Sequence, residues 1–252
     1  MEQIESKRGG FNGNHLKLIA ILAMTVDHAA DLLFVGFPIQ PIPIVLHLIG
    51  RLTAPMMWFF VVEGFYYTKD LKRYMGRMLL FAILSHFAYC FAFGIDCLPL
   101  RSGIFNQTSV IWPLFWALVA LWIFHRNTTW KHWQKILALV AILIITFPAD
   151  WSCIAVMAIL MMYDQRGNPK KQWLVMAFWV LIYAVVSFFC VSRAYGLVQL
   201  GVLLVYPFWR RYNGERGKAR WLKWFFYVYY PAHLILVGIL RLLLYGNVPL
   251  LF

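Results

Sequence analysis

Apolar segments long enough to cross a lipid bilayer follow one another along this chain of 252 residues. A transmembrane helix needs about 20 mostly apolar residues. Charged residues make up only 13% of the sequence and apolar residues 62%, whereas a soluble domain has roughly 25% and 45–50%. A soluble chain of this size has too little interior to bury so many apolar side chains. The sequence therefore predicts an all-α, polytopic integral membrane helix bundle.

The sequence predicts about nine transmembrane helices in a single domain that fills residues 1–252. A proline and a carboxylate, Pro148 and Asp150, interrupt one long apolar run, which is typical of a turn. The two short helices on either side of this turn are either two tilted spans or a re-entrant pair. The expected segments are Leu16–Phe34, Ile44–Tyr67, Met78–Phe93, Ser109–Phe124, Gln134–Phe147, Trp151–Tyr163, Trp173–Val191, Tyr195–Trp209 and Trp221–Tyr245.

The net charge of +13 follows the loops of this topology. In a soluble protein such a charge would suggest binding to nucleic acid. Here most of the 23 lysines and arginines fall in loops on one side of the predicted membrane, whereas the opposite loops contain only Arg101 and Arg193. Basic residues concentrate in the cytoplasmic loops of membrane proteins. We therefore expect a cytoplasmic amino terminus, a lipid bilayer as partner and no nucleic acid.

Three ionisable residues, Asp27, His28 and Asp31, lie within the first predicted span. Each costs about 2.5–3.5 kcal/mol at the centre of a membrane helix. Asp31 follows His28 by three residues, so its carboxylate can reach the imidazole and orient it as a general base. Lys17 shares a helix face with His28 to within about 20°, roughly 16 Å closer to the cytoplasm. The alternative is a packed histidine, with Asp27 capping or pairing.

Arg51 and Glu63 lie in the second predicted span, in its outer half and near its cytoplasmic end. Arg51 either neutralises Asp27 or Asp31, or stabilises a developing oxyanion or an acceptor group. Pro55 has no amide N–H, so it frees the backbone carbonyl of Arg51 one turn earlier.

Basic residues cluster just after the second span, at Lys72, Arg73 and Arg77. Together with Lys17 at the same boundary, they would bind phosphate groups well. Binding to anionic lipid, or simple snorkelling of long side chains to the interface, is the alternative explanation.

His233 lies about halfway along the ninth predicted span, four residues after Tyr229 and three after Tyr230. This spacing predicts that both tyrosine hydroxyls flank the imidazole, while Pro231 kinks the helix. An ordinary aromatic belt at the interface is the alternative.

His86 has no such flanking partner and is expected to be a packed residue. The four cysteines show no metal-ligand spacing, so we expect no metal and no disulfide framework.

Four stretches of the sequence form a pattern: Leu16–Ala20 with Asp27–His28, Gly50–Arg51 with Pro55 and Glu63–Phe65, Ala149–Asp150, and Phe226–Tyr227 with Tyr230–Pro231 and His233–Leu234. Together they resemble the TraX-type family of membrane acetyltransferases, whose founding member acetylates the amino terminus of a conjugative pilin. Asn106 also fits the pattern, whereas His86 stands where the family suggests an acidic or amide residue. The chain is also similar to the broader membrane acyltransferase family three, in which ten residues separate a basic residue from an essential histidine, as they separate Lys17 from His28.

The resemblance implies an acyltransferase that moves an acetyl group from cytoplasmic acetyl-CoA to an acceptor amine or hydroxyl. The acceptor would be the amino terminus of a pilin-like peptide, a cell-surface glycan or a lipid, and the enzyme a multi-pass protein of the bacterial inner membrane. We expect catalytic roles for His28, Asp27, Asp31 and Arg51, acetyl-CoA binding by Lys17, Lys72, Arg73 and Arg77, and acceptor binding by Glu63, Asp150, Tyr230 and His233.

A proton-coupled small-molecule transporter is the main alternative function. Asp, His and Arg side chains inside the membrane, together with a proline-broken helix, also suit a carrier. The odd number of spans and the lack of a visible inverted repeat argue against it. A non-catalytic scaffold would leave the cost of burying Asp27, His28 and Asp31 without a purpose.

Overall fold

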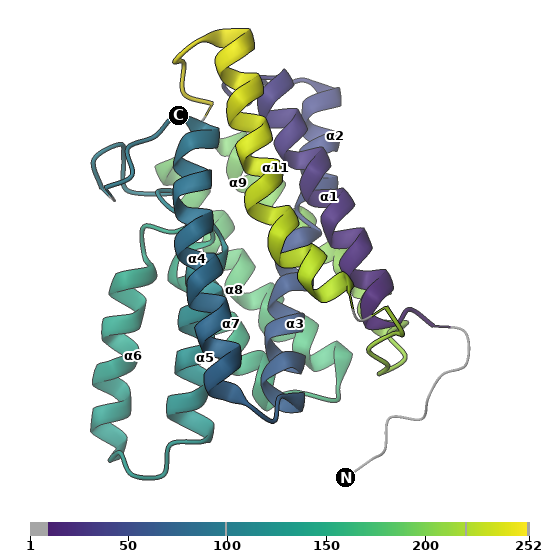
Figure 1. The fold of residues 1–252 in the computed structure, drawn as a ribbon, viewed down its shortest axis with the longest axis vertical. Coiled ribbons are helices and arrows are strands. Elements are labelled where there is room, and N and C mark those ends of the chain that lie inside the picture. The colour runs from purple at the N-terminus through teal and green to yellow at the C-terminus, as the bar shows by residue number, and fades with distance from the viewer. Residues whose placement is uncertain (1–9, 99, 220, 251–252) are drawn as a thin grey trace.

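The computed structural model describes residues 10–98, 100–219 and 221–250, and within these ranges the chain folds into helices without a β-strand (Figure 1). The helices run alternately up and down the bundle, except that α3 continues in the direction of α2 and the segments after α9 continue in the direction of α9. The elements are α1 (Gly13–Leu33), α2 (Pro41–Gly50), α3 (Thr53–Tyr67), α4 (Leu71–Phe93), α5 (Ile111–His125), α6 (His132–Thr146), α7 (Ser152–Asp164), α8 (Pro169–Cys190), α9 (Arg193–Gln199), the 3₁₀ helix η1 (Leu200–Val205), α10 (Tyr206–Arg210) and α11 (Leu222–Tyr245).

Among the described residues, four helical segments are long and apolar enough to cross a membrane, namely Pro41–Tyr67, Leu71–Phe93, Pro169–Cys190 and Trp224–Tyr245. Helices α5, α6 and α7 have 13 to 15 residues, fewer than the roughly 20 that a perpendicular span needs. The all-helical, membrane type of the fold is therefore confirmed. The count of nine spans and the cytoplasmic amino terminus stay predictions.

Two of the expected continuous spans are interrupted. The second breaks at Arg51, between α2 and α3, where Pro55 in the first turn of α3 has no N–H for the Arg51 carbonyl. The expected span Tyr195–Trp209 is wrong as a single helix, because α9 gives way to η1 and then to α10. Pro207 is the second residue of α10, in the first turn, where a missing N–H disturbs no helical hydrogen bond.

Helix α4 begins at Leu71, seven residues before the expected start at Met78. The Asp70 side chain caps this end by accepting a hydrogen bond from the Arg73 amide at 2.9 Å. The basic cluster after the second span therefore lies on the first turns of a helix and not in a loop.

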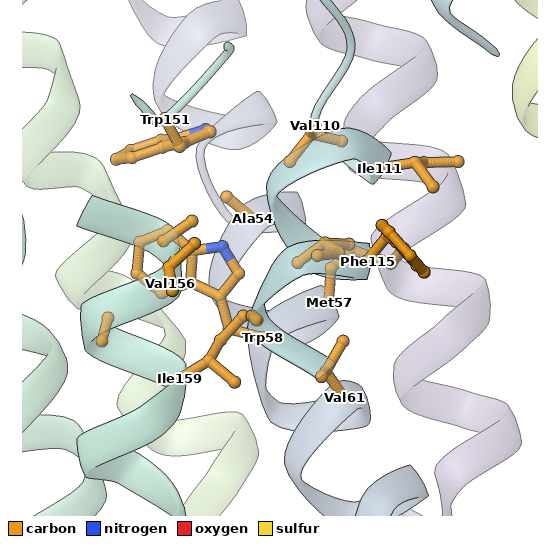
Figure 2. Packing of buried hydrophobic residues seen from close by; sticks show 14 of the residues in the cluster. Ala54, Met57, Trp58, Val61, Val110, Ile111, Phe115, Trp151, Val156 and Ile159 are labelled. Atoms are coloured by element: carbon orange, nitrogen blue, oxygen red, sulfur yellow. The ribbon is translucent and has the colours of Figure 1, made fainter. Parts of the chain in front are cut away.

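The core of the bundle lies between α3, α5 and α7 (Figure 2). Trp58 of α3 is fully buried, and its ring meets Trp151 edge to face at 5.4 Å. Because lipid tails are as apolar as these side chains, close packing holds such helices together more than exclusion of water does. This packed centre fixes α3, against which α1 and the neighbouring α2 are placed.

Candidate functional site

Asp27 of α1 is the centre of a group of charged and polar side chains that we call the aspartate cluster, consisting of Asp27, His47, Arg51 and Gln199. Arg51 donates from Nη2 to both carboxylate oxygens of Asp27, at 3.0 and 3.2 Å. His47 Nδ1 lies 2.8 Å from Asp27 Oδ1, and Arg51 Nη1 donates to Gln199 Oε1 at 3.2 Å. Arg51 therefore neutralises Asp27, as one of the two sequence interpretations expected.

Two members of this cluster, His47 and Gln199, were missed from the sequence. His47 is only 1% exposed and lies four residues before Arg51, so the two side chains share one helix face. That spacing was a readable signal. Gln199 is an isolated amide in an apolar run, and its position at the junction of α9 and η1 depends on tertiary structure.

Gly50 allows α2 to approach the carboxylate of α1 closely. A Cβ atom at this position would collide with the Cβ, Cγ and Oδ1 atoms of Asp27. Glycine is thus required beside the charged pair, one residue before the helix breaks at Arg51.

The expectation that Asp31 orients His28 is wrong. Asp31 Oδ1 lies 4.0 Å from His47 Nε2, whereas His28 turns toward α11. Asp150 lies in the turn before α7, where its amide donates to the Thr108 carbonyl at 2.9 Å. The side chains of Asp27, Asp31 and Arg51 are 15%, 16% and 10% exposed, so none of the three is completely enclosed.

His28 and His233 form a pair between α1 and α11. His28 Nδ1 lies 2.6 Å from His233 Nε2, and the angle between the two ring planes is 5°, so the rings meet edge to edge. His233 Nδ1 lies 3.0 Å from the Tyr229 carbonyl. Because a carbonyl only accepts, Nδ1 of neutral His233 carries the proton and its Nε2 accepts from His28 Nδ1. His28 Nε2 is then left as a lone-pair acceptor, which is the state that a general base needs.

The tyrosines before His233 contact it with their rings and not with their hydroxyls, which corrects the sequence prediction. The Tyr229 ring stacks on the imidazole at 5.2 Å, while its hydroxyl bonds to Thr25 Oγ1 at 2.7 Å. The Tyr230 ring meets the imidazole edge to face, with 5.4 Å between the ring centres. The Tyr229 hydroxyl turns away because it has a partner in Thr25 of α1.

A cavity of about 550 Å³, which we call the basic pocket, opens at the end of the bundle where α1 begins. Lys17 of α1, Arg77 of α4 and Arg216 of the loop before α11 line it. The Lys17 ammonium lies 5.3 Å from the centre of the Phe60 ring. Arg77 bonds to the Tyr227 hydroxyl, and its buried Nε has no hydrogen-bond partner within the described part of the chain.

Two of the four residues predicted to bind acetyl-CoA phosphates do not line this pocket. Lys72 and Arg73 are exposed outside it, and Arg73 pairs with the capping residue Asp70 at 3.3 Å. They lie on the first turn of α4, one turn beyond Arg77. Arg216 takes part instead, and no sequence pattern had marked it.

Glu63 lines the basic pocket, but its charge is balanced by a residue from another loop. Arg166, between α7 and α8, donates to the two carboxylate oxygens of Glu63 at 2.8 and 3.1 Å. The same guanidinium lies 3.5 Å from the centre of the Tyr66 ring. Glu63 therefore holds the α7–α8 loop against the pocket wall.

His86 is a packed residue, as expected. Its Nδ1 lies 2.9 Å from Thr108 Oγ1 and its Nε2 lies 2.8 Å from the Cys97 carbonyl.

Comparison with known proteins gives one family and one close relative. The family model described as "TraX protein" matches residues 12–241. The chain is 33% identical over 241 residues to a protein of Dichelobacter nodosus named "Probable fimbrial assembly protein FimC, serogroup H1". The match covers 92% of this chain and 96% of that relative. No solved structure matches the chain.

Proposed function

Because the chain belongs to the TraX family, we propose that it is a membrane-embedded acetyltransferase acting on a pilin-like peptide. It takes an acetyl group from acetyl-CoA at the end of the bundle where α1 begins, and transfers it to an amine or hydroxyl of the acceptor. The name of the relative, a probable fimbrial assembly protein, favours a peptide acceptor over a glycan or a lipid. The proposal includes a location in the bacterial cytoplasmic membrane, with the basic pocket facing the cytoplasm.

The basic pocket suits the phosphate-rich end of acetyl-CoA. Three cations from three different elements, Lys17, Arg77 and Arg216, face one cavity. The buried Nε of Arg77, which has no hydrogen-bond partner among the described residues, is a donor available to a phosphate oxygen. When bound there, acetyl-CoA supplies an acetyl group activated as a thioester.

The observation that carries the proposal is that the same two helices line the pocket and hold the imidazole pair. Helix α1 supplies Lys17 to the pocket and His28 to the pair, roughly 16 Å apart along the axis. Helix α11 supplies Tyr227 to the pocket and His233 to the pair. In the proposal, the pantetheine arm of acetyl-CoA follows α1 and α11 from the phosphate site to the base.

His28 Nε2 acts as the general base in this proposal. It takes the proton of the acceptor N–H or O–H as that group attacks the thioester carbonyl, and returns it to the sulfur of the departing CoA. His233 keeps His28 in the required tautomer. In this proposal Asp31 and Asp150 receive the acceptor, because their carboxylates suit the positive charge of a peptide amino terminus.

Arg51 has a positioning role with one donor to spare. Its Nη1 and Nη2 are used by Gln199 and Asp27, and its buried Nε has no partner in the described part of the chain. We assign Asp27 and Arg51 to holding α1 against the α2–α3 break, with the Arg51 Nε available to a developing oxyanion.

The test uses membranes from cells with and without the chain, incubated with acetyl-CoA that carries carbon-14 in its acetyl group. We expect label in protein of the membrane fraction only when the chain is present, together with release of CoA thiol. His28→Ala removes both signals, whereas the exposed His15→Ala on the same helix leaves them unchanged. Equal labelling by the His28→Ala membranes would remove His28 from the chemistry.

A proton-coupled transporter is the second candidate, and one observation favours it. The breaks in two helices meet, because Arg51 at the α2–α3 break donates to Gln199 at the α9–η1 junction. Broken helices at membrane depth often surround the substrate of a carrier. Uptake of a solute into sealed vesicles without acetyl-CoA would support the transporter, whereas stabilisation by CoA in a thermal shift would support the transferase.

A further inference from the structure

The end of α4 folds back on itself so that two cysteines meet. Gly94 adopts the left-handed conformation, with a φ of 69°, and ends the helix. The amides of Gly94 and Ile95 both donate to the Cys90 carbonyl, at 2.9 and 3.1 Å. The chain then returns along the helix, so that the Cys97 carbonyl accepts a hydrogen bond from His86 Nε2 at 2.8 Å.

This return places the Cys97 side chain beside that of Cys90. His86 and Cys90 are four residues apart and share one face of α4, and Cys90 Sγ lies 3.8 Å from His86 Nδ1. His86 Nε2 lies 4.0 Å from Cys90 Sγ and 2.8 Å from the Cys97 carbonyl, so both cysteines border the same imidazole nitrogen. Cys90 is buried and Cys97 is exposed. A disulfide requires two cysteines that lie close together, and an exposed partner that an oxidant can reach.

The loop that a bond between these cysteines would fix, residues 94–109, carries part of the candidate site. After Cys97 the chain continues to Thr108, whose hydroxyl meets His86 at 2.9 Å and whose carbonyl accepts from the Asp150 amide. Asn106 in the same loop donates to the Tyr195 hydroxyl at 3.2 Å. The 94–109 loop thus links the end of α4 to the turn that presents Asp150.

We propose that Cys90 and Cys97 form a disulfide in the mature protein, fixing the 94–109 loop to α4. The loop lies at the end of the bundle opposite the start of α1, which is the face predicted to meet the oxidising compartment outside the cytoplasm (Figure 1). The Cys97 thiolate attacks the disulfide of a thiol oxidoreductase and releases one of its thiols. Cys90 then attacks the mixed disulfide and releases the second, so that two protons and two electrons pass to the oxidant.

This proposal depends on the fold and its orientation, and it stands whether or not the chain transfers acetyl groups. Membranes from cells that make the full chain are quenched in acid and denatured in detergent with N-ethylmaleimide, and then reduced and treated with deuterated N-ethylmaleimide. Tryptic cleavage after Arg77 and Arg101 leaves both cysteines in one peptide. We expect deuterated label on Cys90 and Cys97, and ordinary label on Cys153 and Cys190.

A variant separates the disulfide from mere protection of a buried thiol. In Cys97→Ser, Cys90 loses its partner and takes up the ordinary label. Ordinary label on both cysteines of the unaltered chain overturns the proposal, as does deuterated label on Cys90 in Cys97→Ser. The first result would mean that the thiols stay reduced, and the second that Cys90 is joined to something else.

Discussion

The aspartate cluster and the basic pocket both concentrate charge inside the bundle, but they balance it differently. In the cluster, the carboxylate of Asp27 is shared by His47 and Arg51 at 2.8 and 3.0 Å, so the protein neutralises its own charges. In the pocket, Lys17 and Arg77 face a cavity beside Arg216.

The carboxylate of Glu63, which lines the same cavity, is paired with Arg166 from the loop between α7 and α8. Charges that the fold itself compensates hold helices together, and losing one partner is costly because the other remains buried. Cations gathered around a cavity are instead suited to an anionic ligand. We therefore propose a structural role for the aspartate cluster and ligand binding for the basic pocket.

Removing the proposed general base, His28, which belongs to neither region, should have the largest effect on acetyl transfer. We expect His28→Ala to lower acetyl transfer by about 10²- to 10⁴-fold, the usual range for a general base. Folding and binding of CoA should persist, because neither the cluster nor the pocket contains His28. Initial rates with radiolabelled acetyl-CoA measure the loss, and a variant that no longer binds CoA would contradict the separation of the two regions.

Breaking the aspartate cluster should affect stability before chemistry. Asp27→Ala leaves the Arg51 guanidinium buried without its carboxylate, which costs about 3–5 kcal/mol. The free energy of unfolding in mixed micelles measures this cost. Adding Arg51→Met to Asp27→Ala should recover part of it, since the stranded charge is removed. Simple addition of the two losses would show that the residues do not act as a pair.

A substitution in the basic pocket should weaken the binding of acetyl-CoA. Arg77→Ala removes a charged hydrogen-bond donor worth about 1.5–3 kcal/mol, so the KM for acetyl-CoA should rise by roughly 10- to 100-fold while the protein stays folded. Arg73→Ala is the matched control, because this arginine on the same helix is exposed and outside the pocket. Equal effects of the two substitutions would mean that the cavity is not the donor site.

The close approach of α2 to α1 gives the smallest of these effects. Gly50→Ala places a methyl group against Asp27, and overpacking of this kind costs about 1–3 kcal/mol. Gly76→Ala is the control, because a Cβ there meets no atom within 4 Å. Thermal unfolding in detergent should show a lower midpoint only for Gly50→Ala. An unchanged midpoint would show that Asp27 moves aside without loss.

The apolar segments predicted the membrane-type helical fold, because the length of an apolar helix is a local property. Periodicity along one helix also placed Lys17 in the basic pocket. It failed for Asp31, which is spaced to reach His28 but lies next to His47 of another helix. The His28–His233 contact joins residues 205 positions apart, and no local pattern indicates such a partner.

Other features depend on the way neighbouring helices meet. The change from α9 to η1 occurs where Gly201 packs against Leu48 and Arg51 of the broken helix. Arg216 joins the pocket from a loop, where periodicity gives no guidance. The sequence therefore predicted where the helices lie and some of the residues that share a helix face. The contacts between side chains of different helices could be seen only in the structure.

The paired imidazoles described above also form a hydrogen-bonded path for a proton, and this path ends inside the protein. From His28 Nε2 the hydrogen-bonded path runs through His233 to the backbone oxygen of Tyr229, and an amide carbonyl is too weak a base to carry a proton onward. A proton taken up at His28 therefore has to depart through the nitrogen that received it. A path that is closed at one end allows acid–base chemistry inside a membrane without letting protons cross it, so the proton gradient of the membrane is preserved.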